Sequence, residues 1–265
     1  MANKRVGKRT VKLQNNPTII SAACVVGPKE GQGPLKDYFD LVLGDDLYGE
    51  KSWELAESKM VQTAMQMAVK KAGKKLEDVN YLFGGDLINQ ILPASFAARE
   101  LGVPFLGIYG AGSTMAEGMC LNSMLIDGGF ADLILSGTSS HYCTAERQFR
   151  YPLELGNQKP MTAQWTVTGA GCGILSKEGK GHNITMATIG RVVDYGINDM
   201  NNMGAAMAPA IAIIGLCGMI LPRISNTKIY SKGGKYSINN VCEIQLGSQQ
   251  NILLTFYYRI KIQII

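Results

Sequence analysis

The segment that most constrains the fold is a nearly uncharged run in the middle of the chain. The sequence GAGST at residues 110–114 leads into residues 115–126, where Glu117 is the single charged residue. A helix with so little charge is buried all round, and small side chains let neighbouring backbones approach closely. Such small residues recur along this segment at Gly112, Ala116, Cys120 and Ser123. The sequence therefore predicts a helix enclosed by other elements and ended by the glycines at 128–129.

Strands and helices are expected to alternate over the first 200 residues. Thr18–Val26 is a short apolar run that predicts a buried strand. Residues 51–72 carry apolar side chains at helical spacing, with Ser52 as N-cap and Gly73 as stop. Another helix is expected at 94–101, with strands at 81–83, 104–109, 131–136, 165–167 and 184–193. Polar turns are expected at 84–86 and after residue 136, with a loop through 150–152. This alternation predicts an α/β fold with parallel β-α-β units.

The charge distribution gives no reason to expect a nucleic-acid partner. The net charge is +5, but residues 1–210 carry 20 basic and 20 acidic residues. The excess lies in residues 211–265, with six basic residues and one acid. The six cysteines are widely spaced without a CxxC pair, which favours free thiols and predicts neither a metal site nor a disulfide framework.

Targeting signals are weak in this chain. No apolar run precedes Ile19, so no secretory signal is predicted. The uncharged stretch Met203–Leu221 is nominally long enough to span a bilayer, but three glycines and Pro209 weaken that interpretation. From Ile211 the composition changes, because thirteen of the last 55 residues are isoleucine and acids nearly vanish.

Several motifs, in order and spacing, resemble the stage V sporulation protein AD family. They are GDLINQ at 85–90, GAGST at 110–114, TSSH at 138–141, AERQFRYP at 145–152 and DMNNMGAAMAPA at 199–210. The resemblance implies a thiolase-like layered α/β fold, in which two halves pack around buried central helices. It also implies a role in binding dipicolinic acid within a membrane-associated assembly that moves calcium dipicolinate into the spore and out again in germination.

The resemblance divides the chain into three parts. Residues 1–180 correspond to a complete first α/β half, and residues 181–210 to the start of a second half that is largely missing. Residues 211–265 match nothing recognisable. Their Ile/Lys/Asn/Tyr-rich composition is typical of AT-rich DNA read in the wrong frame. We interpret the chain as a truncated or frameshifted member; the alternative is a genuine divergent tail.

The position of the thiolase nucleophile argues against catalysis. In thiolase-like enzymes a cysteine at the start of the first buried helix is activated by the helix N-terminus. Gly112 occupies that position here, and Cys120 comes two turns later. Ser113 would need a base, and the chain contains only His141 and His182. The sequence therefore predicts a protein that is not an enzyme, with Ser113 as the N-cap of the helix.

The same helix start is the predicted ligand site. Free N–H groups and the helix dipole favour a carboxylate there, with Gly112, Ser113 and Thr114 in contact. Asp86 and Asn89 are expected to follow a strand end, where α/β sites usually lie, although Asp86 as a cap or turn residue is the alternative. Further candidates with turn or packing roles as alternatives are Ser139, Ser140, His141 and Met203.

Other patterns predict no site. Arg147 and Arg150 lie close to Glu146 and fit a structural ion pair. The glycine-rich residues 169–173 precede a strand and lack a lysine, so nucleotide binding is rejected and no cofactor is expected.

The resemblance implies partners and a location as well. Expected partners are dipicolinic acid, free or as its calcium chelate, other proteins of the stage V sporulation A operon, and a second copy in a homodimer. The expected location is the forespore or spore, peripheral at the inner membrane. Two alternatives stay open for the function: an acyltransferase of the ketoacyl-synthase or thiolase type, and a nonfunctional truncated product.

Overall fold

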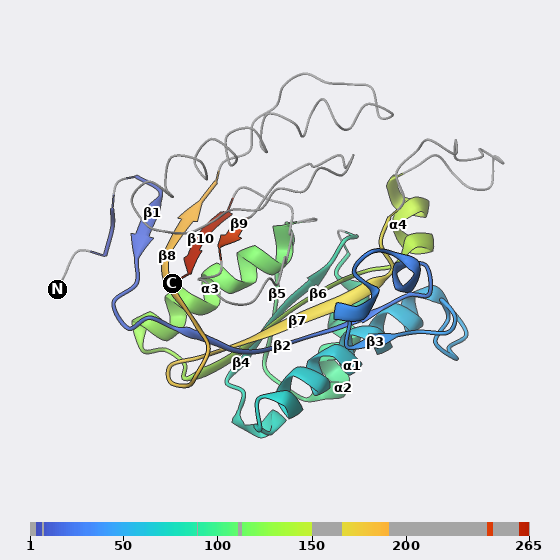
Figure 1. Cartoon of the computed structure of the whole chain (residues 1–265), viewed down its shortest axis with the longest axis horizontal. Helices are drawn as coiled ribbons and strands as arrows, with labels where there is room; N and C mark the ends of the chain where they lie inside the picture. Colours follow the sequence, from blue (N-terminus) through green and yellow to red (C-terminus); the bar gives the residue numbers. More distant parts are fainter. Residues whose placement is uncertain are drawn as a thin grey trace, which may run out of the picture.

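The computed structural model describes residues 4–6, 8–88, 90–110, 113–149, 166–190, 243–245 and 260–264. These residues form one sheet with helices on both of its faces (Figure 1). The strand order is β5-β4-β6-β7-β2-β8-β10-β9, with β1 beside β8 and β3 beside β2. The strands are β1 Thr10–Lys12, β2 Thr18–Val26, β3 Leu41–Val42, β4 Tyr81–Asp86, β5 Phe105–Gly107, β6 Leu133–Ser140, β7 Gly169–Ser176, β8 His182–Ile189, β9 Glu243–Gln245 and β10 Ile260–Ile264. The helices are α1 Trp53–Lys71, α2 Leu92–Leu101, α3 Thr114–Gly128 and α4 Tyr142–Phe149, with short 3-10 turns at Glu30–Gln32, Lys36–Tyr38 and Leu76–Asp78.

The strongest periodic patterns produce the predicted elements. The strand at Thr18–Val26 is confirmed as β2. Helix α1 begins after Ser52, whose hydroxyl oxygen accepts a hydrogen bond from the Leu55 N–H at 3.3 Å, and the predicted N-cap is confirmed. The buried helix α3 is also confirmed. It ends at Gly129, whose φ of 78° suits a residue without a side chain.

The sheet is mixed rather than parallel throughout. Strand β4 pairs in parallel with β5 and β6, as the predicted β-α-β units require. However, β7 is antiparallel to both β6 and β2, and β2 is antiparallel to β8. The predicted parallel β-α-β units therefore do not extend to β7 and β8, because hydrophobic periodicity reports burial and carries no information on strand direction.

Three predicted loops are regular structure. Residues 84–86 complete β4, residues 137–140 complete β6, and helix α4 replaces part of the loop predicted after residue 136. The strand predicted at 165–167 is instead β7, which includes the glycine-rich residues 169–173. Glycine at the end of β6 serves close packing, because a Cβ on Gly137 would overlap the Met65 Cε.

The helices divide over the two faces of the sheet. Helices α1 and α2 cover one face and α3 covers the other (Figure 1). One buried cluster joins Met60, Met65 and Leu82 on the α1–α2 face, and a second joins Phe83 and Met119 on the α3 face. Because strand side chains alternate, Leu82 and Phe83 of β4 point to opposite faces.

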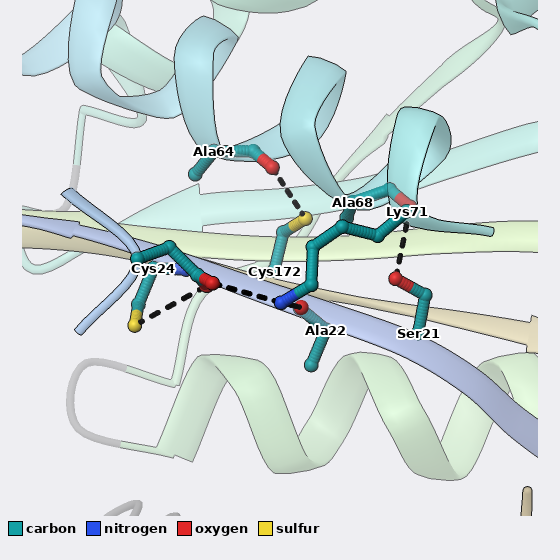
Figure 2. A network of polar contacts seen from close by, with 8 residues as sticks. Ser21, Ala22, Cys24, Ala64, Ala68, Lys71 and Cys172 are labelled. Atoms are coloured by element: carbon teal, nitrogen blue, oxygen red, sulfur yellow. Dashed lines mark hydrogen bonds and ion pairs between the residues drawn. The ribbon is translucent and has the colours of Figure 1, made fainter. Parts of the chain in front are cut away.

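Polar contacts attach α1 to the middle of the sheet (Figure 2). The Ser21 hydroxyl donates to the Ala68 carbonyl at 2.9 Å, and the Cys172 thiol donates to the Ala64 carbonyl at 3.3 Å. Lys71 donates to the Ala22 carbonyl at 2.7 Å. The expected free thiols are confirmed for the four cysteines in the described residues, at 24, 120, 143 and 172.

No described helix combines the length and apolar character that a bilayer crossing needs. The stretch Met203–Leu221 lies outside the described residues.

Candidate functional site

The candidate site lies where β4 and β6 end side by side. These strands are parallel, and their last paired residues are Asp86 and Ser139. Helix α3 begins nearby, because Gly85 of β4 packs directly against the chain that enters the helix. A Cβ on Gly85 would overlap the Ile108 carbonyl oxygen and lie 3.0 Å from the Thr114 Cγ2. The end of β4 and the start of α3 are therefore in direct contact through Gly85.

The start of α3 is fixed by hydrogen bonds to Gly110. The Ser113 hydroxyl donates to the Gly110 carbonyl at 2.8 Å, and the Thr114 hydroxyl oxygen accepts from the Gly110 N–H at 3.2 Å. Ser113 occupies the N-cap position, but its side chain accepts no helix N–H, so the predicted capping bond is wrong. The hydroxyl is instead turned back to the Gly110 carbonyl, which the Ser113 N–H also contacts at 2.9 Å.

A carboxyl group that the motif analysis missed lies beside this helix start. Glu117 lies in the first turns of α3, and a Cβ on Gly110 would lie 2.8 Å from its Oε2. Partial burial raises the pKa of Glu117. As the single charged residue in an otherwise uncharged segment, Glu117 could have been identified from the sequence.

Asp86 points to the other face of the sheet. Its Oδ2 accepts a hydrogen bond from the Ala94 N–H at 3.2 Å, in the first turn of α2, so Asp86 acts as a cap for that helix. The Asp86 side chain is fully buried, and its Oδ1 has no partner among the described residues. Burial raises the pKa of Asp86 to about 6.

A second buried acid, Glu57 of α1, was also missed. The Ser139 hydroxyl donates to its Oε1 at 2.8 Å, and the Thr144 hydroxyl lies 3.1 Å from its Oε2. Burial raises the pKa of Glu57 to about 8, assisted by the negative charge of Asp86 and opposed by the bond from Ser139. The signal was available, because position 57 falls between Ala56 and Met60 on the apolar face of the predicted helix.

Both ring nitrogens of His141 are occupied. The Nδ1 accepts from the Cys143 N–H at 3.2 Å, so the proton lies on Nε2, which donates to the Asp46 carbonyl at 2.8 Å. The side chain is fully buried, with its ring centre 6.5 Å from that of Trp53. None of these partners belongs to α3, so the described contacts do not place His141 as a base for Ser113.

The sheet thus separates the predicted ligand residues into two groups. Ser113 and Thr114 lie at the start of α3, whereas Asp86 and Ser139 contact α2 and α1 on the opposite face. Ser140 donates its hydroxyl hydrogen to the Val167 carbonyl. The predicted ligand residues Asn89, Gly112 and Met203, and the side chains of residues 146–150, lie outside the described residues.

One thiol lies farther along α3. Cys120 is buried two turns into α3, and burial raises the pKa of its thiol. Among the described residues no group of three or more His, Cys, Asp or Glu side chains could hold a metal ion.

Comparison of structures identifies the fold as thiolase-like. OleA of Xanthomonas campestris matches with a TM-score of 0.57 at 13% sequence identity, over 88% of this chain and 78% of that chain. FabH, the 3-oxoacyl-(acyl carrier protein) synthase III of Xanthomonas oryzae pv. oryzae, matches with a TM-score of 0.54 at 14% identity, over 88% and 78%. At such identities the similarity establishes the fold alone.

Comparison of sequences establishes the family. Stage V sporulation protein AD of Bacillus subtilis is 46% identical over 209 residues, which are 79% of this chain and 62% of that protein. The chain thus spans about three fifths of the length of this curated relative. The family profile of Stage V sporulation protein AD (SpoVAD) matches residues 7–216. The chain therefore belongs to the stage V sporulation protein AD family.

Proposed function

We propose that this protein binds dipicolinate at the start of α3 and forms no acyl-enzyme there. In this role it is a non-catalytic component of the spore inner-membrane assembly for calcium dipicolinate uptake and release. The observation that carries the proposal is the sequence GAGSTMA at 110–116, which supplies the start of a buried helix but no thiol.

The hydrogen bonds of the site support a non-catalytic role. A serine nucleophile needs a base within hydrogen-bond reach. The Ser113 hydroxyl donates to the Gly110 carbonyl, and His141 is bonded through both ring nitrogens to other groups. Cys120, the next thiol along α3, is buried and has a raised pKa. Among the described residues of α3, neither Ser113 nor Cys120 is therefore placed to form an acyl-enzyme.

The helix start suits a carboxylate. An α-helix leaves its first N–H groups without intrahelical acceptors, and its dipole favours negative charge there. A carboxylate at such a position gains roughly 0.3–1 kcal/mol when exposed and up to about 2 kcal/mol when partly buried. The Ser113 hydroxyl could also donate to the carboxylate by rotating away from the Gly110 carbonyl, to which it now donates.

Glu117 favours the calcium chelate over the free dianion. Its carboxyl group lies beside Gly110, where it repels a second negative charge when ionised. Calcium bound between the two dipicolinate carboxylates neutralises the ligand and removes this repulsion. We therefore expect calcium to tighten binding.

Titration calorimetry on the full chain tests the proposal. Pyridine-2,6-dicarboxylate should bind, more tightly with calcium, whereas pyridine-3,5-dicarboxylate, which has the same charge but cannot chelate, should bind at least tenfold more weakly. Ser113→Ala should weaken binding several-fold, and Ser95→Ala, an exposed serine of α2, should leave it unchanged. Equal binding of the two isomers would contradict the proposal.

An acyltransferase is the second candidate, because OleA and the FabH synthase share this fold. Intact-mass measurement after incubation with acyl-CoA distinguishes the two functions. We expect no mass increase, and a covalent adduct would establish the acyltransferase. A nonfunctional product would instead bind neither ligand and would be insoluble or cleaved by proteases beyond residue 210.

We propose a homodimer and contacts with other proteins of the same operon as the partners. Strand β5 lies at one edge of the sheet; its Leu106 is 45% exposed, and Tyr109, which follows the strand, is 41% exposed. A sheet edge with apolar side chains is suited to pairing with another chain. Light scattering should therefore give a dimer mass, and Leu106→Lys should give the monomer.

A further inference from the structure

We propose that a basic hairpin at residues 4–12 docks this protein on an anionic membrane surface. The inference rests on the membrane association proposed above and is independent of dipicolinate binding. The hairpin contains five basic residues, and the first acidic residue of the chain is Glu30. The basic residues are Lys4, Arg5, Lys8, Arg9 and Lys12.

Backbone hydrogen bonds define the hairpin. Arg5 and Val11 form an antiparallel bridge. The Val6 N–H donates to the Thr10 carbonyl and the Lys12 N–H to the Lys4 carbonyl, each at 2.8 Å. The second arm of the hairpin, β1, pairs with β8 on the side of the molecule away from α1 and α2 (Figure 1).

The hairpin is anchored through Asp127, in the last turn of α3. Lys4 Nζ forms an ion pair with Asp127 Oδ2 at 2.7 Å, and the carboxylate is almost fully buried. The N–H groups of Gln14 and Asn15 both donate to Asp127 Oδ1 at 2.7 Å. These bonds lower the pKa of Asp127, although its burial acts in the opposite direction. The charge of Lys4 is therefore compensated by Asp127, and this ion pair attaches the hairpin to α3.

The remaining basic side chains face solvent. Arg5, Lys8, Arg9 and Lys12 are all exposed. Within the described part of the chain, Lys8, Arg9 and Lys12 form no ion pair.

Some lysines elsewhere on the described surface are paired. Lys59 pairs with Glu50 at 2.8 Å, Lys71 with Asp40 at 2.9 Å, and Lys177 with Asp132 at 3.5 Å. Within the described residues, Lys36, Lys51 and Lys74 are also exposed without an ion pair, so the hairpin differs from them in gathering its basic residues on a stretch that contains no acid.

Two apolar side chains accompany these charges. Val6 is 53% exposed and Ile189 is 48% exposed. The Ile189 N–H donates to the Arg9 carbonyl at 3.0 Å, which places Ile189 beside the hairpin. Exposed aliphatic groups among basic residues suit the headgroup region of a bilayer, where the charges meet anionic lipids and the aliphatic groups meet acyl chains. Single-stranded nucleic acid would instead call for aromatic stacking platforms, and residues 4–12 contain no aromatic side chain.

The membrane contact should depend on charge and salt. Each Lys or Arg near an anionic leaflet strengthens binding roughly five-fold, so removing three of them should weaken it by about two orders of magnitude. Because the screening length is about 8 Å at physiological ionic strength, added salt should weaken binding further.

The test measures co-sedimentation of the full chain with vesicles. The vesicles contain equal parts phosphatidylglycerol and phosphatidylcholine, or phosphatidylcholine alone. The variant is K8Q/R9Q/K12Q. The matched control is K36Q/K51Q/K74Q, which removes the same charge from exposed positions outside the hairpin. Circular dichroism and dipicolinate titration accompany each variant.

We expect the wild type and the control to bind the anionic vesicles and not the neutral ones, and the hairpin variant to lose about 100-fold in affinity while retaining its fold. Equal binding by both triple variants would overturn the proposal. So would absence of wild-type binding, or tighter wild-type binding to duplex DNA than to the vesicles. Loss of dipicolinate binding with vesicle binding intact would refute only the proposed ligand.

Discussion

Glu57 allows a direct test of the protonation state in the buried network. The Thr144 hydroxyl has one hydrogen but lies within bonding distance of two acceptors, the Glu57 Oε2 at 3.1 Å and the His141 carbonyl at 3.0 Å. A protonated Glu57 resolves this conflict, because it can donate to Thr144 while Thr144 donates to His141. Its pKa of about 8 agrees with that assignment. Glu57→Gln supplies a permanent N–H donor at the same place. We therefore expect the variant to fold with the same hydrogen bonds to Ser139 and Thr144.

The effect on stability follows from the difference between the pKa of Glu57 in the folded and in the unfolded protein. In the unfolded chain Glu57 has its ordinary pKa of 4.5, against about 8 in the folded protein. The folded state binds the proton more tightly, so the associated stability is complete below pH 4.5 and is lost as the pH rises to about 8. At pH 7 the loss is on the order of 3 kcal/mol, since each pKa unit corresponds to about 1.4 kcal/mol. Glutamine avoids this loss but leaves one amide hydrogen unpaired, at a cost of about 1 kcal/mol.

Urea unfolding at a series of pH values checks this reasoning. The stability of the E57Q variant should equal that of the wild type or fall slightly below it near pH 5, and exceed it by about 2 kcal/mol at pH 7. The matched control, Glu77→Gln, changes an exposed glutamate and should stay within about 0.5 kcal/mol at every pH. If E57Q and the wild type show parallel pH dependence, Glu57 is ionised in the folded protein and the assignment is refuted.

Further predictions concern the anchor, the strand end and the ligand. Asp127→Asn should lower the free energy of unfolding at pH 7 by about 2 kcal/mol. Between pH 7 and pH 3 the variant should lose less stability than the wild type does, and urea titration at the two pH values measures both losses. Gly85→Ala should prevent folding or lower the free energy of unfolding by several kcal/mol, because its Cβ would overlap the Ile108 carbonyl oxygen. The control Gly44→Ala, whose Cβ would meet nothing within 4 Å, should leave the melting temperature unchanged. Glu117→Gln should tighten binding of free dipicolinate about five-fold in calorimetry and reduce the difference in affinity with and without calcium. Unchanged affinity would show that the ligand lies elsewhere.

The elements with strong periodicity could be predicted from the sequence. The strand at Thr18–Val26, helix α1 with its Ser52 cap, and the buried helix α3 lie close to their expected positions. The motifs also identified the family and the fold. The ends of β4 and β6 were missed because their glycines and serines resemble turns. In the structure the absent side chain of Gly137 is replaced by the Met65 side chain, which only the tertiary packing determines.

The candidate site was only partly predictable. The positions of Ser113, Asp86 and Ser139 near strand ends predict one site, but Asp86 and Ser139 point to the face covered by α1 and α2, whereas Ser113 begins α3 on the other face. The raised pKa of Glu57 depends on the burial of α1 against the sheet and on the approach of Ser139 from β6. The helical pattern places Glu57 on the buried face of α1, but the approach of Ser139 is a long-range contact that no local pattern encodes.

The start of α3 keeps its position without any thiol. Gly85 admits the Ile108 carbonyl to close contact, and Ser113 and Thr114 both bond to the backbone of Gly110. None of these contacts involves a side chain at position 112. In the proposed function, Gly112 offers no side chain to carry an acyl chain, and the described contacts that position the helix start do not depend on one. We therefore expect acyl chemistry and anion binding to separate experimentally: Gly112→Cys should introduce a reactive thiol, detectable by iodoacetamide labelling, while dipicolinate still competes for the same position. Labelling that dipicolinate does not slow would place the ligand away from α3.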